Sequence, residues 1–223
     1  MKYFYIQFPK TGTQSVLQSL RGKIISDGHK ILREIKNNTN DEIYTFSTIR
    51  DPLKYYISMY KYKVDSKDSV KNYGIMENNS FEDFIHDYVL CHNIEKWEKP
   101  WMNNYRQMLI KKHIQGKQKN IGYFTILYIF YSYKDPENIL KQDDILGYLR
   151  KNKPDVDHII RLEHLKKDYD YLVKKYDYPK IESFSHINKS TQNIKINYND
   201  YLHLKEKDYF IYENYYKNEL NHN

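Results

Sequence analysis

The sequence predicts an α/β fold in which a mostly parallel central sheet is flanked by helices on both faces. Along the first third of the chain, short runs of aromatic and β-branched residues alternate with apolar residues at helical spacing, and this alternation is typical of βαβ units. The 223 residues suit one domain, 1–223, and 40% hydrophobic residues suffice for a sizeable core. Ligands of such sheets bind beyond the carboxyl ends of the strands, so the segments that follow strands are the first candidates for a site.

The expected elements follow one another in a regular order. Aromatic and β-branched runs predict the strands, and apolar residues three or four positions apart predict the helices. In chain order we expect a strand at 3–8, a loop at 9–15, a helix around 16–20, a strand at 23–26, a turn at 27–29, a helix around 31–35, a strand at 43–49, a helix around 53–60, a surface loop at 65–80, a helix at 81–90 capped by Ser80, a helix at 101–114, a strand at 123–133, a helix at 136–151, a strand at 158–162, a helix at 163–176 and a helix at 198–220. The segment at 123–133 also fits a buried helix, which would be equally apolar.

Net charge and cysteine content limit the kinds of partner and the cellular compartment that we expect. The net charge of +7 comes from dispersed lysines and arginines, and we expect most of the lysines on a solvated surface. The alternative is that the charge attracts an anionic ligand, and the dispersal argues against a dedicated nucleic-acid arm. Cys91 is the only cysteine, so an intramolecular disulfide and a Cys-based metal site are excluded. No signal pattern precedes the first strand pattern, and no apolar run reaches the length of a membrane span. We therefore expect a cytoplasmic protein with no membrane span and no nucleic-acid partner.

The loop that follows the first strand has the composition of an anion cradle. Residues 9–15 read Pro-Lys-Thr-Gly-Thr-Gln-Ser and lead directly into a helix pattern. Backbone N–H groups of such a loop and of the first helical turn point at one spot, where the helix dipole adds partial positive charge. Lys10 adds a full charge, and the hydroxyls add hydrogen-bond donors. The segment is no Walker A motif, because its lysine precedes the single glycine.

A second candidate motif follows the strand at 43–49. Arg50 stands at the strand end, Asp51 and Pro52 turn the chain, and Ser58 lies about two helical turns further on. An arginine offers a planar fork that suits a phosphate, and a serine adds a hydroxyl donor. Arg50 and Ser58 can therefore reach one small anion.

Together the two motifs resemble those of the sulfotransferases that use 3′-phosphoadenosine 5′-phosphosulfate (PAPS). The pattern is closest to the branch of heparan sulfate 2-O-sulfotransferase and of bacterial and viral carbohydrate sulfotransferases. The resemblance covers 3–62, continues at 159–165, and returns at 185–190 in a His-x-Asn-x-Ser loop. It implies a P-loop-type three-layer fold, with 65–155 as a mostly helical acceptor-binding insertion. The cofactor-binding residues that it implies are Lys10, Thr11, Gly12, Thr13, Gln14, Ser15, Arg50, Ser58, Asn188 and Ser190.

The resemblance also implies the chemistry. The first loop would bind the 5′-phosphosulfate of PAPS, and Arg50 and Ser58 its 3′-phosphate. His29, between the two motifs, is the expected general base for the acceptor hydroxyl, and neutral imidazole is suited to that task at physiological pH. Lys10 is the second expected catalytic residue, because it would stabilise charge on the leaving phosphate. Glu34 and Glu42 are the alternative bases. The expected reaction transfers a sulfuryl group to a hydroxyl, with a glycan as the favoured acceptor, 3′,5′-ADP (PAP) as product and no metal.

Two other functions stay open at the level of sequence. One is a P-loop-like nucleotide kinase or NTPase, against which the missing Gly-Lys-Ser/Thr counts. The other is a non-catalytic basic module that binds nucleic acid. Preference for 3′,5′-ADP over ATP separates the first from the enzyme that we expect, and salt-sensitive binding to DNA or RNA separates the second.

Overall fold

The computed structural model describes residues 2–37, 42–65, 80–88, 121–184, 194 and 196–217. The chain divides into two compact units, each built from several segments. The sheet unit comprises residues 1–51, 127–136 and 149–189, and the helical unit comprises 52–126, 137–148 and 190–223. No helix in the described part of the chain is long and apolar enough to cross a membrane.

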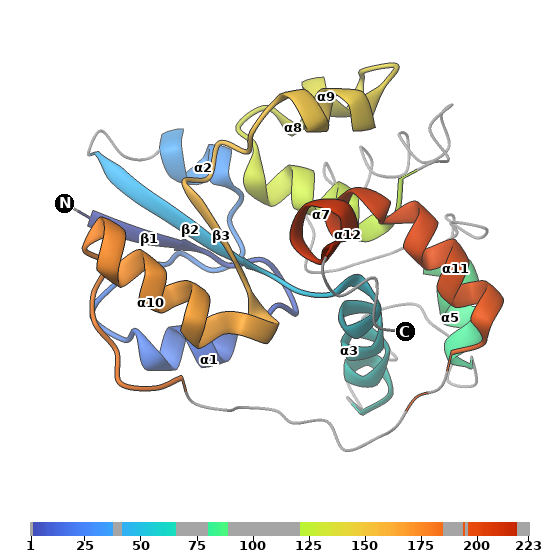
Figure 1. Cartoon of the computed structure of the whole chain (residues 1–223), viewed down its shortest axis with the longest axis horizontal. Coiled ribbons are helices and arrows are strands. Elements are labelled where there is room, and N and C mark those ends of the chain that lie inside the picture. The colour runs from blue at the N-terminus through green and yellow to red at the C-terminus, as the bar shows by residue number, and fades with distance from the viewer. Residues whose placement is uncertain are drawn as a thin grey trace. The chain divides into compact units, whose positions relative to one another are not determined.

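The sheet unit is built on three parallel strands in the order β1-β2-β3 (Figure 1). β1 (Lys2–Ile6) pairs with β2 (Ile43–Ile49), which pairs with β3 (His158–Arg161). The register places Ile6 opposite Ser47 and Ile49 opposite Arg161. Because the strands are parallel, their carboxyl ends meet at one edge, which we call the carboxyl edge. The expected strands at 3–8, 43–49 and 158–162 and the α/β class are confirmed.

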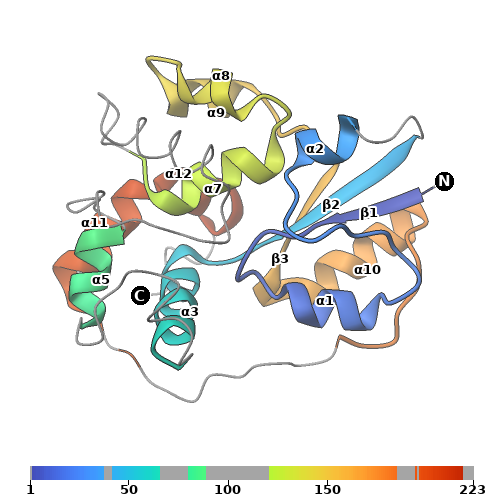
Figure 2. The same ribbon diagram turned by 180° about the vertical axis from the view of Figure 1, so that it is seen from behind.

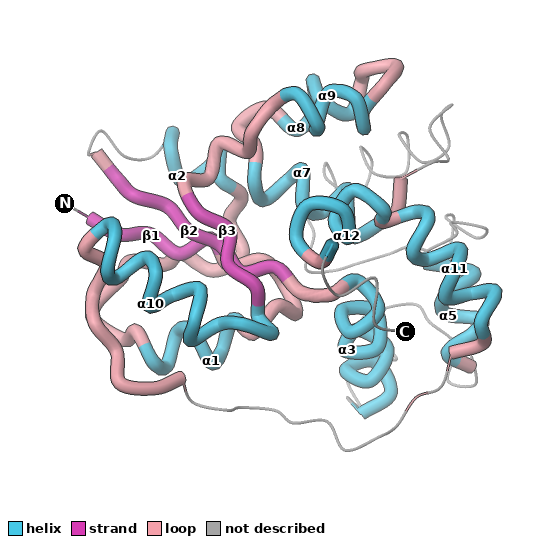
Figure 3. Tube along the Cα trace, viewed as in Figure 1, coloured by secondary structure: helices cyan, strands magenta, loops and turns pink. Residues whose placement is uncertain are grey.

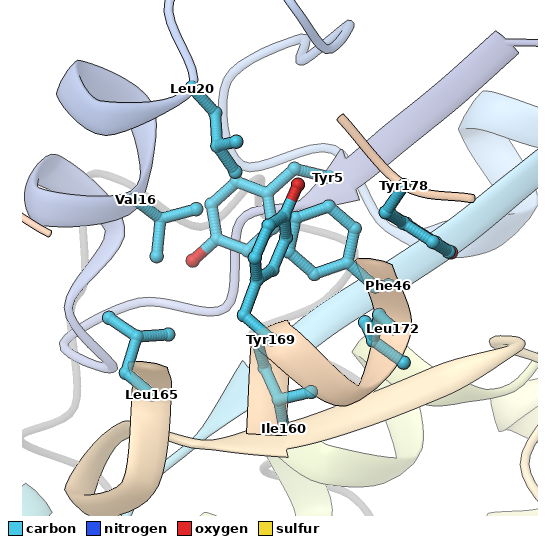
Figure 4. Packing of buried hydrophobic residues seen from close by; sticks show 9 residues of the cluster. All are labelled: Tyr5, Val16, Leu20, Phe46, Ile160, Leu165, Tyr169, Leu172 and Tyr178. Carbon is cyan, nitrogen blue, oxygen red and sulfur yellow. The ribbon is translucent and has the colours of Figure 1, made fainter. Parts of the chain in front are cut away.

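Helices cover both faces of this sheet. α1 (Thr13–Ser19) and α10 (Leu165–Tyr176) lie on one face, and α2 (Leu32–Asn37) lies on the other (Figures 1 and 2). Figure 4 shows the core between the sheet, α1 and α10. In this core the rings of Tyr5 and Phe46 pack with their centroids 5.0 Å apart. The buried members of this core are Tyr5, Val16, Leu20, Phe46, Ile160, Leu165, Tyr169, Leu172 and Tyr178.

The expected strand at 23–26 is wrong, although one residue pairs as a strand would. Ile25 forms an isolated parallel bridge with Phe4. Its N–H donates to the Tyr3 carbonyl, and its carbonyl accepts from the Tyr5 N–H, each at 2.9 Å. These two hydrogen bonds are those of one isolated bridge, and the neighbours of Ile25 do not pair with β1. The turn at 27–29 and the helix that follows it are confirmed.

The expected strand at 123–133 is also wrong. Residues 123–132 form a helix, α7 (Tyr123–Ser132), as Figure 3 shows. All ten of its side chains are buried. Burial on every side removes the polar positions that would reveal a period of 3.6, so the sequence pattern alone could not separate a helix from a strand.

Two expected helices each contain a break. The segment 136–151 forms α8 (Pro136–Leu140) and α9 (Ile145–Lys151), and 198–220 contains α11 (Tyr198–Lys207) and α12 (Tyr209–Tyr215). Asp144 precedes α9 and accepts the Gly147 N–H at 2.8 Å, which is the contact of a helix cap. The helix at 163–176 is confirmed as the 3₁₀ helix η2 (Leu162–His164) followed by α10.

The helical unit also contains α3 (Pro52–Asp65), which confirms the expected helix around 53–60, and α5 (Phe81–Tyr88). Ser80 caps α5, because its hydroxyl accepts the Asp83 N–H at 3.1 Å. Tyr60 on α3 packs against Phe81 with ring centroids 5.3 Å apart. The expected helix at 101–114 lies outside the described residues.

A buried carboxylate holds the helical unit together. Asp208, between α11 and α12, accepts the Tyr56 hydroxyl at 2.7 Å and the hydroxyl and N–H of Thr125 at 2.7 and 2.9 Å. Tyr56 in turn accepts the Phe124 N–H at 3.0 Å. Two N–H groups in the first turn of α7 thereby find acceptors from distant segments, which satisfies donors that a helix leaves without internal partners. Burial raises the pKa of Asp208 to about 6, although its hydrogen bonds act in the opposite direction.

This carboxylate predicts a pH-dependent stability. The folded state binds the proton of Asp208 at a higher pH than the unfolded chain does, so ionisation costs stability as the pH rises from about 4 through about 6. Asp208→Asn keeps the shape and the carbonyl acceptor but does not titrate. The free energy of unfolding of the native protein should therefore fall, relative to Asp208→Asn, by up to about 3 kcal/mol across this window.

Urea unfolding at pH 4.5, 6 and 7.5 measures the difference. Asp208→Ala is the control, because it removes the acceptor and should lose about 1–3 kcal/mol at every pH. Parallel pH profiles for the native protein and Asp208→Asn would contradict the assignment.

Candidate functional site

The loop between β1 and α1 turns tightly at the carboxyl edge. The Phe8 N–H donates to the Ile6 carbonyl at 2.9 Å, which bends the chain as soon as β1 ends. Lys10 and Gly12 both take left-handed backbone angles, with φ of 61° and 82°. Gly12 then precedes α1 as its N-cap. We call the segment Phe8–Gly12 the first loop.

A chain of buried hydroxyl groups ties the first loop to the sheet. The Thr11 hydroxyl donates to the Phe8 carbonyl at 2.7 Å and lies 2.8 Å from the Thr48 hydroxyl on β2. The Thr48 hydroxyl lies 2.7 Å from that of Tyr5 on β1. Since Thr11 donates its only hydroxyl proton to Phe8, it accepts from Thr48, and Thr48 accepts from Tyr5. We call Tyr5, Thr48 and Thr11 the hydroxyl relay.

The relay changes what the threonines of the loop can do for an anion. The Thr13 hydroxyl also donates to the Phe8 carbonyl, at 3.1 Å. Both threonine protons are therefore used inside the protein, and an anion would meet the backbone N–H groups of Thr11 and Thr13 instead. Exposed Gln14 and half-buried Ser15 lie in the first turn of α1, where N–H groups lack helical partners. α1 has only seven residues, so its dipole adds less than the charged side chains do.

Lys10 and Arg50 come together at the carboxyl edge. Arg50 follows β2 directly, and its guanidinium donates to the Lys10 carbonyl at 3.4 Å. Burial and the neighbouring Arg50 charge lower the pKa of Lys10 to about 8. A carboxylate fixes the chain at this point, since Glu163 accepts the Asp51 N–H at 3.2 Å. Two cationic side chains, each past the end of one of two neighbouring strands, thus repel each other in a position where an anion would relieve the repulsion.

His29 lies at the same end of β1. Its Nδ1 is 2.8 Å from the Gln7 carbonyl, one residue before the first loop begins. A carbonyl oxygen only accepts, so Nδ1 carries the proton and Nε2 of the neutral ring has the lone pair. The Gln7 amide donates to the Ser26 hydroxyl, and the Tyr131 hydroxyl donates to the His29 carbonyl at 3.3 Å. His29 is an exposed residue. This tautomer is the one that a base acting through Nε2 requires.

Glu34 and Glu42, the alternatives to His29 as general base, are engaged or located elsewhere. Glu34 accepts the Ile31 N–H at 2.9 Å, which caps the start of α2. Glu42 precedes the first residue of β2 and therefore lies at the amino end of the sheet, opposite the carboxyl edge. Neither position favours a role beside Lys10.

The remaining expected cofactor residues stay predictions. Ser58 is half-buried on α3 and belongs to the helical unit, so its pairing with Arg50 stays a prediction. Asn188 and Ser190 lie outside the described residues. The expected acceptor region at 65–155 contributes segments to both units, and its role, like the single domain 1–223, stays a prediction.

Sequence reasoning missed Thr48 and Leu162. Thr48 is a fully buried polar residue inside β2, and its hydroxyl partners lie 43 and 37 positions away, so no local signal in the sequence marks it. Leu162 at the end of β3 packs so closely on Gly12 that a Cβ at Gly12 would overlap its side chain. Nearby Arg161 is occupied by a structural pair, because its guanidinium donates to both carboxylate oxygens of Asp168 at 3.1 and 3.2 Å.

No protein-family model matches the chain, and no curated protein matches it in sequence. The resemblance to sulfotransferases therefore rests on the motifs themselves. Among the residues that the structure describes, no group of three or more His, Cys, Asp or Glu side chains could hold a metal ion.

The contact between Gly12 and Leu162 predicts a substitution that the loop cannot accept. Gly12→Ala imposes a left-handed angle on alanine and also overlaps Leu162. Gly22 is a matched control, with φ of 74° and nothing within 4 Å of an added Cβ. Gly22→Ala should cost about 1–2 kcal/mol of unfolding free energy from the backbone alone. Gly12→Ala should cost a further 1–3 kcal/mol or so from overpacking.

Urea unfolding of both variants measures the two costs. The double variant Gly12→Ala/Leu162→Ala should lose less than the sum of the two single changes, because the smaller side chain removes the overlap. Equal losses for Gly12→Ala and Gly22→Ala would contradict the close contact.

Proposed function

We propose that this chain is a PAPS-dependent sulfotransferase with a P-loop-type fold, which transfers a sulfuryl group to a hydroxyl of a carbohydrate acceptor. The observation that carries the proposal is the meeting of Lys10 and Arg50 at the carboxyl edge, where the Arg50 guanidinium donates to the Lys10 carbonyl. Lys10 and Arg50 each belong to one of the two sequence motifs that resemble the PAPS-binding motifs of sulfotransferases.

The donor set suits a nucleotide with phosphate groups at two positions. Lys10 offers an ammonium group on the first loop, and Arg50 offers a planar fork at the end of the next strand. Burial and, to a smaller extent, the Arg50 charge lower the pKa of Lys10 to about 8, and a bound anion would raise this pKa again. Lys10 and the loop N–H groups would hold the 5′-phosphosulfate of PAPS, and Arg50, with Ser58, the 3′-phosphate.

His29 and Lys10 divide the chemistry between them. PAPS supplies the sulfuryl group. His29 takes the proton of the acceptor hydroxyl on Nε2, while its Nδ1 stays bonded to the Gln7 carbonyl. The acceptor oxygen forms the new bond to sulfur as the bond from sulfur to the phosphate oxygen breaks, and the Lys10 ammonium stabilises the charge that this oxygen gains. A half-buried ammonium interacts with that charge more strongly than a solvated one would.

Nucleotide binding tests the cofactor assignment. We expect 3′,5′-ADP to raise the melting temperature and 5′-ADP to raise it less, because only the former offers a 3′-phosphate to Arg50. Arg50→Ala should weaken 3′,5′-ADP about tenfold to a hundredfold, as measured by calorimetry. Binding should also weaken as the pH rises above about 8, where Lys10 loses its charge.

Arg150→Ala is the matched control, because Arg150 is an exposed arginine on α9. An affinity for 3′,5′-ADP that Arg50→Ala leaves unchanged would count against the 3′-phosphate assignment. Binding of ATP with Mg²⁺ and no response to 3′,5′-ADP would favour the kinase or NTPase alternative. Salt-sensitive binding of DNA or RNA that survives Lys10→Ala would favour the nucleic-acid module.

Turnover tests the roles of His29 and Lys10. His29→Asn keeps a donor for the Gln7 carbonyl but removes Nε2, so it should lower kcat by about 10²–10⁴-fold with 3′,5′-ADP affinity retained. Lys10→Ala should abolish measurable transfer. Transfer of ³⁵S from labelled PAPS to a panel of soluble glycans measures both.

His203→Ala is the control for His29, because His203 is an exposed histidine on α11. Full turnover in His29→Asn would move the base to another residue. Turnover in Lys10→Ala would remove Lys10 from the chemical step.

A further inference from the structure

The hydroxyl relay has no task in the proposed reaction, yet it is built entirely from buried groups. Tyr5, Thr11 and Thr48 have exposed fractions of 0%, 0% and 1%. They come from β1, the first loop and β2, and the relay ends on the Phe8 carbonyl. Each of the three hydroxyls of the relay has a hydrogen-bond partner, so deleting one leaves its neighbour unsatisfied.

The relay acts on the part of the loop that contains Lys10. Hydrogen bonds from Thr11 and Thr13 to the Phe8 carbonyl close the chain on either side of Gly12 and hold residues 8–13 in a tight turn. Lys10 lies inside that turn with φ of 61°, an angle that is unfavourable for a residue with a side chain. Such an angle persists only where surrounding contacts fix it. The hydroxyl bonds are contacts of this kind.

β2 and the residue that follows it therefore contact the first loop at two points. Thr48 on β2 bonds to Thr11, and Arg50, just past the end of β2, bonds to the Lys10 carbonyl. We infer that Thr48 is a positioning residue, which acts through Thr11 to set the place of Lys10 beside Arg50 and so prepares the anion site. This inference rests on the proposed function for the identity of the anion, but the position of Lys10 can be measured without any ligand.

The first measurement is the pKa of Lys10 in the ligand-free protein. Competitive labelling with trace acetic anhydride over a pH series, read by mass spectrometry, gives the value for each lysine. Thr48→Val keeps the side-chain shape and removes the hydroxyl. The loosened loop should then expose Lys10 to water and separate it from Arg50, so its pKa should rise from about 8 towards the ordinary 10.5.

Two further variants separate positioning from a general loss of stability. Thr48→Ser restores the hydroxyl and should return the pKa of Lys10 to the native value. Thr45→Val makes the same change at the amino end of β2, where it removes a 2.6 Å hydrogen bond to Asp157. It should lower stability but leave Lys10 unchanged.

The second measurement is calorimetry with 3′,5′-ADP. Thr48→Val should weaken binding about tenfold, Thr48→Ser should restore it, and Thr45→Val should leave it unchanged.

A pKa of Lys10 that stays at its native value in folded Thr48→Val would overturn the inference, and so would an equal rise of this pKa in Thr45→Val. If the native protein binds no 3′,5′-ADP, the proposed function fails, while the labelling result still decides the role of Thr48. If Thr48→Val does not fold, Tyr5→Phe, which removes the outer hydroxyl of the relay, is expected to raise the pKa of Lys10 in the same direction, and no rise would overturn the inference.

Discussion

The carbonyl oxygen of Phe8 is the contact on which the carboxyl edge of the sheet depends. Two threonine hydroxyls donate to it, at 2.7 and 3.1 Å. A buried carbonyl needs a partner, and here the partners come from residues three and five positions further along the same loop. The loop closes on its own backbone, Lys10 is forced into a left-handed angle, and its carbonyl is presented to Arg50. The order Thr-Gly-Thr thus has a structural reason beside its resemblance to a phosphate-binding motif.

The parts of this edge that sequence predicts are those that depend on local pattern. The strands at 3–8 and 43–49 are aromatic and β-branched runs that end in turn residues, and both form. Parallel pairing then brings Lys10 and Arg50 together without any further information. The relay could not be predicted in the same way, because its hydrogen bonds join residues 43 and 37 positions apart. No local pattern distinguishes Thr48 from any other threonine in a strand.

The wrong expectations have the same physical origin. Ile25 has the composition of a strand residue, but only the neighbouring backbone of β1 decides that a single bridge forms there. Residues 123–132 become a helix in surroundings that bury every side chain, and Asp208 supplies the acceptor for the Thr125 N–H from 83 residues away. Local composition favoured a strand at 23–26 and was ambiguous at 123–133, and in both segments contacts with distant residues decided the outcome.

The two buried polar networks differ in one respect that bears on function. The network of the helical unit contains a carboxylate, so its strength changes with protonation of Asp208. The relay of the sheet unit contains only hydroxyls, and burial raises the pKa of Tyr5 to about 12. The relay therefore holds the first loop equally across the physiological range. Any dependence of anion binding on pH in that range then comes from groups at the edge itself, above all Lys10.

His29 and Lys10, both at one end of β1, differ in their access to water. His29, the proposed base for the acceptor, is exposed, and Lys10, the proposed partner of the leaving group, is half-buried. In the proposed reaction, a bulky acceptor such as a glycan would approach exposed His29, while the charge on the leaving group would form beside half-buried Lys10, where the protein excludes more of the solvent.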